Sequence, residues 1–195
     1  SNSMKLLLAG MALSAVCGAF SSFIVYFANN KEGMQTIAYW MMGSLAGAQW
    51  RELAVIAPII VLSIVFFWTQ SRVLNLMLLG DESAITMGTD LHAYRQWYLL
   101  ISSLIVGFAV YSAGMIGFVG LIVPHVIRMF TGPDHKRLLP VAALVGAIFL
   151  VVADGLCRVI IPHTELPIGI LISMIGAPSF IYLMIKKTYG FGGSD

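Results

Sequence analysis

Six apolar runs, each close to the length that crosses a bilayer, limit what this chain can fold into. A transmembrane helix needs ~20 mostly apolar residues. Within a bilayer only helices and closed barrels satisfy their own backbone hydrogen bonds. The runs predict an all-α, polytopic membrane helix bundle of about six transmembrane helices. They cover residues 6–28, 53–69, 97–115, 116–130, 138–161 and 168–185.

The composition agrees with a membrane protein. Hydrophobic residues make up 59% of the 195 residues and charged residues only 10%, whereas a soluble domain carries about 25% charged residues. The net charge of +2 is too small to favour nucleic acid as a partner. The cysteines Cys17 and Cys157 lie within apolar runs, and neither their spacing nor that of the histidines indicates a disulfide framework or a metal site.

The positive charges predict the orientation of the chain. If it crosses the membrane six times, most of its lysines and arginines fall on one side, and both termini share that side. The positive-inside rule makes that side cytoplasmic. A re-entrant fourth run would abolish the bias, so we expect a full crossing after a tight turn near residues 114–117. The cytoplasmic set is Lys5, Arg72, Arg95, Arg128, Lys136, Arg137, Lys186 and Lys187, and the opposite set is Lys31, Arg51 and Arg158.

Two long connections join the first three runs. The outer one, residues 29–52, contains a predicted short amphipathic helix at residues 37–43. The inner one, residues 72–95, predicts a helix-turn-helix in which Asp81 caps a second short helix that ends at Gly88. Such a hairpin is suited to docking a soluble partner, and the alternative is a plain connector.

Polar residues interrupt the apolar runs at a few places. Gly117, Gly120, Pro124 and His125 break the fourth run, so this backbone must be buried in protein or line a cavity. For His125, structural hydrogen bonding and a role in gating both remain open.

Asp154 and Arg158 lie four residues apart and share one face of a helix. They form an internal pair, or Arg158 faces outward to receive an acidic partner. Glu165 precedes Pro167, which can open the last helix. An intramembrane enzyme that uses Asp154, His163 and Glu165 is the alternative function. The chain has no glycine-rich nucleotide loop with its lysine, so we predict transport that is powered elsewhere.

Residues 117–125, followed by Arg128, resemble the GFVGLIVPHxxR signature of the FecCD-type permeases. These proteins are the membrane subunits of ABC importers for iron-siderophores, haem and cobalamin. The resemblance covers most of residues 5–187, because several separate motifs follow in the same order. They are residues 42–45, 79–82, 87–88, 134–140, 153–154, 165–169 and 176–178.

The resemblance implies the fold and the site residues. The family fold has ten spans, and residues 5–187 match its C-terminal part. Independently of the resemblance, residues 1–3 are interpreted as a remnant of cloning and residues 188–195 as a flexible tail. The residues implied to form the cytoplasmic coupling helices that seat on an ATPase are Leu79, Gly80, Asp81, Glu82, Ala84 and Gly88. Arg158 is implied to dock the substrate-binding protein. The implied structural positions are Gly117, Gly120, Pro124, His125, Arg128, Asp154, Glu165, Pro167 and Gly169.

The resemblance also implies the function. We expect a permease in a bacterial or archaeal plasma membrane that imports an iron-siderophore or related metal chelate, with haem or cobalamin as alternative cargoes. Its implied partners are a second permease subunit, a homodimer being expected, a cytoplasmic ATPase dimer and an extracytoplasmic binding protein. We expect no enzymatic activity, metal or cofactor in this chain, with ATP bound by the partner subunit.

Overall fold

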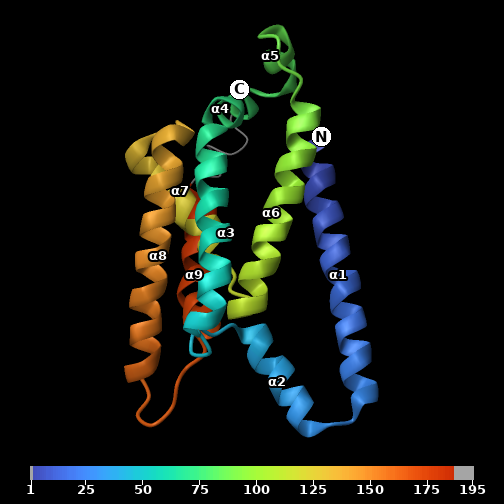
Figure 1. Ribbon diagram of the computed structural model, residues 1–195, viewed down its shortest axis with the longest axis vertical. Coiled ribbons are helices and arrows are strands. Elements are labelled where there is room, and N and C mark those ends of the chain that lie inside the picture. The colour runs from blue at the N-terminus through green and yellow to red at the C-terminus, as the bar shows by residue number, and fades with distance from the viewer. Residues whose placement is uncertain (1, 187–195) are drawn as a thin grey trace. The chain divides into compact units, whose positions relative to one another are not determined.

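The computed structural model describes residues 2–186. Its secondary structure confirms the predicted all-α fold. Within that range there are nine helices and no strand (Figure 1). They are α1 (Asn2–Ala28), α2 (Lys31–Met42), α3 (Trp50–Thr69), α4 (Ser71–Leu79), α5 (Asp81–Thr86), α6 (Leu91–Ala113), α7 (Val119–Thr131), α8 (His135–Val159) and α9 (Ile168–Lys186). The chain forms two compact units, residues 1–41 and 42–195.

Five helices of the described range are long and apolar enough to cross a membrane, namely α1, α3, α6, α8 and α9. The predicted fourth span is shorter than expected, because α7 has only 13 residues. A helix of that length rises about 20 Å, which is less than the ~30 Å of a bilayer's hydrocarbon core. Residues 114–118, most of them outside regular structure, precede it, so the predicted turn between the third and fourth runs is confirmed.

Two helices begin before their apolar runs because an aspartate caps each of them. The Asp90 carboxylate accepts the His92 backbone N–H at 3.0 Å, and α6 begins at Leu91 rather than at the predicted Trp97. The Asp134 carboxylate accepts the Lys136 N–H at 3.1 Å, and α8 begins at His135. Hydropathy finds the apolar part of a helix, whereas capping sets where it starts.

The first unit consists of α1 and nearly all of α2. The predicted outer helix exists but begins six residues earlier, at Lys31, where the Asn30 side chain accepts the Glu32 N–H at 3.1 Å. Asn2 and Ser3, interpreted above as a cloning remnant, continue α1. Lys187 and the predicted tail, residues 188–195, lie outside the described residues.

The second unit packs α3 to α9 around a small buried core. This core consists of Ala153 and Cys157 from α8 with Ile168 and Ile172 from α9. It lies at the end of the unit where α8 and α9 are joined. The other end carries α4 and α5 (Figure 1), and the two ends are called the core end and the hairpin end below.

Two glycines bring three backbone segments together at the core end. The Gly169 N–H donates to the Gly43 carbonyl oxygen at 3.5 Å, and a Cβ on Gly169 would lie only 1.5 Å from the Met42 carbonyl oxygen. Gly43 has φ +80, and a Cβ there would lie 2.8 Å from the Ile116 side chain. Only glycine permits such close approach. The prediction that Gly169 is structural is therefore consistent with its place in the fold.

Candidate functional site

The hairpin formed by α4 and α5 extends beyond the end of α6 (Figure 1). Gly80, with φ 91, joins the two helices and is the N-cap of α5. The prediction that Asp81 caps this helix is wrong, because Asp81 is its first helical residue. The predicted end at Gly88 is confirmed: Gly88 has φ +86, and the Thr89 N–H donates to the Ala84 carbonyl at 2.9 Å. This bond is characteristic of a Schellman C-cap.

The hairpin carries an exposed apolar surface. The exposed fractions are 57% for Leu79, 64% for Ile85 and 62% for Met87. These residues lie outside the candidate membrane spans. Glu82 is also exposed, whereas Ala84 is fully buried. Of the residues predicted to contact an ATPase, Leu79 and Glu82 are therefore available to a partner, and Ala84 instead packs the hairpin together.

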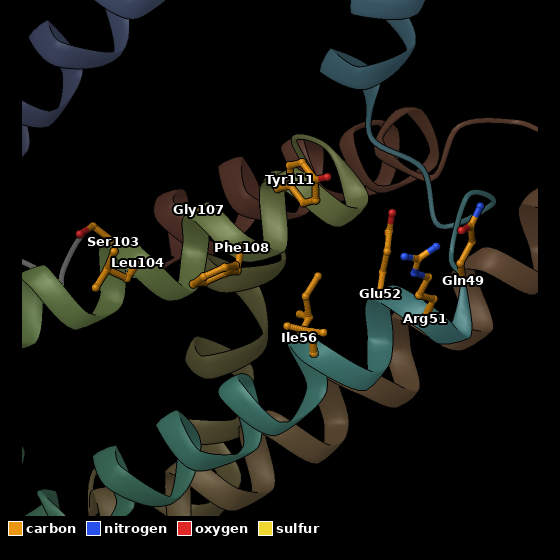
Figure 2. Close-up of a pocket in the computed structure, with 10 residues that line it drawn as sticks. Gln49, Arg51, Glu52, Ile56, Ser103, Leu104, Gly107, Phe108 and Tyr111 are labelled. Atoms are coloured by element: carbon orange, nitrogen blue, oxygen red, sulfur yellow. The ribbon is translucent and has the colours of Figure 1, made fainter.

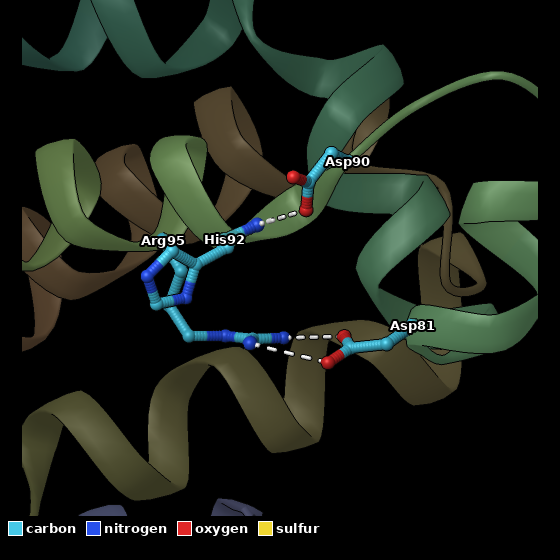
Figure 3. Close-up of polar contacts among 4 residues, drawn as sticks. All are labelled: Asp81, Asp90, His92 and Arg95. Carbon is cyan, nitrogen blue, oxygen red and sulfur yellow. Dashed lines mark hydrogen bonds and ion pairs between the residues drawn. The ribbon is translucent and has the colours of Figure 1, made fainter.

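Asp81 is held by an arginine that sequence reasoning did not single out as a site residue. Arg95 of α6 donates from Nη2 to Asp81 Oδ1 at 2.6 Å and from Nη1 to Oδ2 at 3.3 Å (Figure 3). A guanidinium matches a carboxylate in this two-point geometry. The pair therefore fixes α5 against α6. The sequence signal for it was weak, because Asp81 and Arg95 share one predicted connection but lie 14 positions apart.

A second polar contact fixes α4 to α8. The Asn75 amide donates from Nδ2 to Asp134 Oδ1 at 2.9 Å and accepts the His135 backbone N–H at 2.9 Å. The Trp68 indole N–H donates to the Lys136 carbonyl at 2.9 Å beside it. The bond from Asn75 lowers the pKa of Asp134 from its ordinary value of 3.8, as does, to a smaller extent, the Lys136 backbone N–H. Both bonds favour the ionised carboxylate, because it is the form that accepts them.

At the core end, Arg158 and Asp154 form the internal pair that the sequence left open. Arg158 Nε donates to Asp154 Oδ2 at 3.1 Å. The Arg158 side chain nevertheless remains 48% exposed and that of Asp154 24%. Glu165 is exposed nearby in sequence, and Pro167 directly precedes α9, as predicted. Arg158 is thus both paired and accessible to a partner.

The alternative of an intramembrane enzyme required Asp154, His163 and Glu165 to converge. Asp154 is engaged by Arg158 instead. His163, with φ 64, and Glu165 are exposed in the connection between α8 and α9. Across residues 2–186 no three histidine, cysteine or acidic side chains form a group able to hold a metal ion. The arrangement gives this alternative no support.

Neither Gly117 nor Gly120 of the signature makes the turn before α7. Gly117 and Gly120 have open space around an added Cβ, so neither provides close packing within this chain. Gly114, with φ 77, and Phe118, with φ 68, make the turn. The close contact is at Gly176 of α9, where a Cβ would lie 2.9 Å from the Phe118 Cβ.

Pro124, His125 and Arg128 line one cavity between α7 and α9. Its volume is about 320 Å³, and Leu121 and Met184 are among its other lining residues. Arg128 lies in the last turn of α7, where a positive charge complements the helix dipole. The structure thus brings several signature residues together beside α9, among them Pro124, His125 and Arg128, and it assigns none of them a reaction.

A larger groove lies between α3 and α6 (Figure 2). Its volume is about 800 Å³. Among the described residues, its lining comes from these two helices and from Gln49, which precedes α3. Ile56 from α3 and Phe108 from α6 form its apolar part, while Arg51 and Glu52 lie toward the core end. Sequence analysis did not predict this groove, because it depends on which faces of the two helices meet.

Comparisons with known proteins agree with these features. The chain is 41% identical to the hemin transport system permease protein HmuU of Yersinia pestis, over 95% of this chain and 55% of that protein. It is 42% identical to the cobalamin import system permease protein BtuC of Halobacterium salinarum, over 92% of this chain and 47% of that protein. The chain thus spans about half the length of the curated relatives it matches.

The fold has a solved counterpart. A metal-chelate type ABC transporter in an inward-facing conformation matches with a TM-score of 0.85 and 35% identity, over 92% of this chain and 58% of that one. The family model of the FecCD transport family matches residues 1–186. The chain belongs to the FecCD transport family.

Proposed function

We propose that this chain is part of the membrane-spanning permease subunit of an ATP-driven importer. The observation that carries the proposal is the hairpin of α4 and α5, which exposes Leu79, Ile85 and Met87 outside the candidate spans. Clustered apolar side chains on such a segment are characteristic of a protein interface. The partner is a cytoplasmic ATPase dimer, which binds and hydrolyses the ATP.

The proposal makes the hairpin end cytoplasmic. Arg72, Arg128, Lys136, Arg137 and Lys186 lie toward this end of the second unit. Cytoplasmic connections are enriched in lysine and arginine. The core end, with Arg158 and Glu165, then faces outward in the plasma membrane of a bacterium or archaeon.

Arg158 is the proposed docking residue for a substrate-binding protein. Asp154 holds one nitrogen of the guanidinium while nearly half of the side chain stays exposed. An arginine fixed in this way can bind a carboxylate of a partner without losing much side-chain entropy on binding. Asp154 therefore positions Arg158 and is not itself the contact.

The proposed cargo is a metal chelate. The names of the relatives specify hemin and cobalamin, and the solved counterpart is of the metal-chelate type. These names favour haem or cobalamin over the siderophore that the family resemblance first suggested. Large cargoes of this kind need a pathway wider than one bundle, so a second permease subunit is the proposed partner in the membrane.

The test uses the full-length protein with its ATPase and binding protein in liposomes. Haemin, cyanocobalamin and a ferric hydroxamate siderophore are supplied in turn, and ATP hydrolysis and uptake are measured. One of them should stimulate both. Arg158→Glu should weaken stimulation on the order of tenfold or more, because a like charge opposes an acidic partner. Thr164→Ala, in the neighbouring connection, serves as control. An ATPase that neither associates nor responds to any cargo would refute the proposal.

A further inference from the structure

We propose that Asn75 and Arg95 are positioning residues that pass movement of the hairpin to α8 and α6. The inference rests on the proposed function and deepens it, because it names the internal contacts through which an ATPase would move the spans. Neither residue needs to contact the ATPase. Each joins a hairpin helix to a candidate span.

Asn75 fastens α4 to the first turn of α8. Its amide nitrogen donates to Asp134 and its amide oxygen accepts the His135 backbone N–H, both at 2.9 Å. The same oxygen lies 2.7 Å from His135 Nδ1. These partners allow only one orientation of the amide. Because Asp134 is also the N-cap of α8, a shift of α4 acts directly on the start of that span.

Arg95 fastens α5 to α6 through the two-point pair with Asp81 (Figure 3). One turn further along α6, the Tyr98 hydroxyl donates to the side chain of Gln70, the residue between α3 and α4. Helix α6 is therefore attached to both the beginning of α4 and the beginning of α5. While these contacts persist, movement of either hairpin helix also acts on α6.

Polar contacts add to modest apolar packing of the hairpin. The helix α4 has 9 residues and α5 has 6, and their buried residues are Ser71 and Ala84 alone among those described. Other apolar side chains of α4 are half-buried, namely Val73, Leu74, Leu76 and Met77. Where so few side chains are fully buried, directional polar contacts contribute to where a segment sits. A rigid-body transition needs contacts that survive it. Removal of the two contacts should leave a hairpin that moves without moving the spans.

The neighbouring carboxylates of Asp81 and Glu82 therefore have different surroundings and different expected roles. Asp81 is engaged by Arg95 within the chain, whereas the Glu82 side chain is exposed. A charge reversal at Glu82 tests contact with the ATPase. A charge reversal at Asp81 tests the internal pair, and it should be repaired by reversing Arg95 as well.

The experiment uses the full-length complex in liposomes with the cargo that stimulates the wild type. Uptake per ATP hydrolysed is measured for Asn75→Asp and for Asp81→Arg. Each should lower this ratio on the order of tenfold, a common size for coupling between sites, while ATP hydrolysis and the amount of assembled complex persist. The control is Gln96→Ala, because Gln96 lies beside Arg95 and contacts His92 within its own helix at 3.2 Å.

Two double variants supply the rescue that a merely structural role would not predict. Asn75→Asp with Asp134→Asn exchanges donor and acceptor, and asparagine caps helices as well as aspartate does. Asp81→Arg with Arg95→Asp reverses the ion pair. Both should regain most of the lost ratio. Single variants with wild-type ratios, or doubles without recovery, would overturn the inference. A wild-type complex without stimulated hydrolysis would instead refute the proposed function.

Discussion

At the scale of the residue, Gly169 has the tightest surroundings among the glycines whose contacts are described. Its backbone lies against the Met42 carbonyl, at a distance that leaves no room for a Cβ. It also donates a hydrogen bond to Gly43. The start of α9 is thus fixed to the chain ahead of α3, beside the core residues Ile168 and Ile172.

We predict that Gly169→Ala destabilises the second unit by at least about 3 kcal/mol, the upper end of ordinary overpacking, because the clash involves backbone that cannot rotate away. Unfolding in detergent can be followed by the reactivity of Cys157, which is buried, in a Cys17→Ser background. Gly155→Ala is the matched control, since an added Cβ there meets nothing within 4 Å. Equal melting temperatures for the two variants would contradict the packing described.

At the scale of the element, α7 is the helix whose role hydropathy alone could not settle. Its 13 residues cannot span the hydrocarbon core by themselves. The preceding residues 114–118 lie outside regular structure and add length before the helix. Non-helical backbone at membrane depth is tolerated where protein covers it, and Phe118 packs against Gly176 of α9.

We predict that residues 114–131 complete a crossing. Single cysteines at Ser83, Pro133 and Thr164, in a Cys17→Ser and Cys157→Ser background, can be labelled with an impermeant maleimide in vesicles of known orientation. Ser83→Cys and Pro133→Cys should label from the cytoplasmic side, and Thr164→Cys from the outside. Labelling of Pro133→Cys from the outside, with Thr164→Cys labelled from the cytoplasmic side, would mean that α7 is re-entrant, because α8 separates the two sites.

At the scale of the whole molecule, the groove between α3 and α6 is a place where part of a longer protein could pack, because the relatives of this chain are longer than it is. The chain covers 55% of one of them and 47% of another. The groove is open, and an added Cβ at Gly107 within it meets nothing within 4 Å. Small residues such as Gly107 allow a further helix to approach closely in a membrane.

We predict that Gly107→Trp is tolerated by this chain alone and destabilises the full-length protein by about 1–3 kcal/mol, the usual cost of overpacking. Melting temperatures of both lengths, with and without the substitution, provide the comparison. Gly155→Trp, at an open position of α8, shows whether any effect is specific to the groove. If Gly107→Trp leaves the full-length protein unchanged, no additional span occupies the groove.

The helical membrane fold, the approximate spans, the helix end at Gly88 and the turn near residues 114–117 could all be predicted from the sequence. Each of these depends on local features: the length of an apolar run, or a residue that tolerates positive φ. The family resemblance is confirmed by the match of the family model over residues 1–186.

Contacts between polar residues that are distant in the sequence, unlike the Asp154–Arg158 pair, could be found only from the packing of the helices. Asn75 and Asp134 lie 59 positions apart and Asp81 and Arg95 lie 14 apart, so nothing local indicates either contact. The same holds for Gly43 with Gly169 and for the groove between α3 and α6. These contacts escape prediction because the sequence of a helix shows which of its faces are apolar, but not which neighbouring helix each face meets. That is decided when several helices pack together.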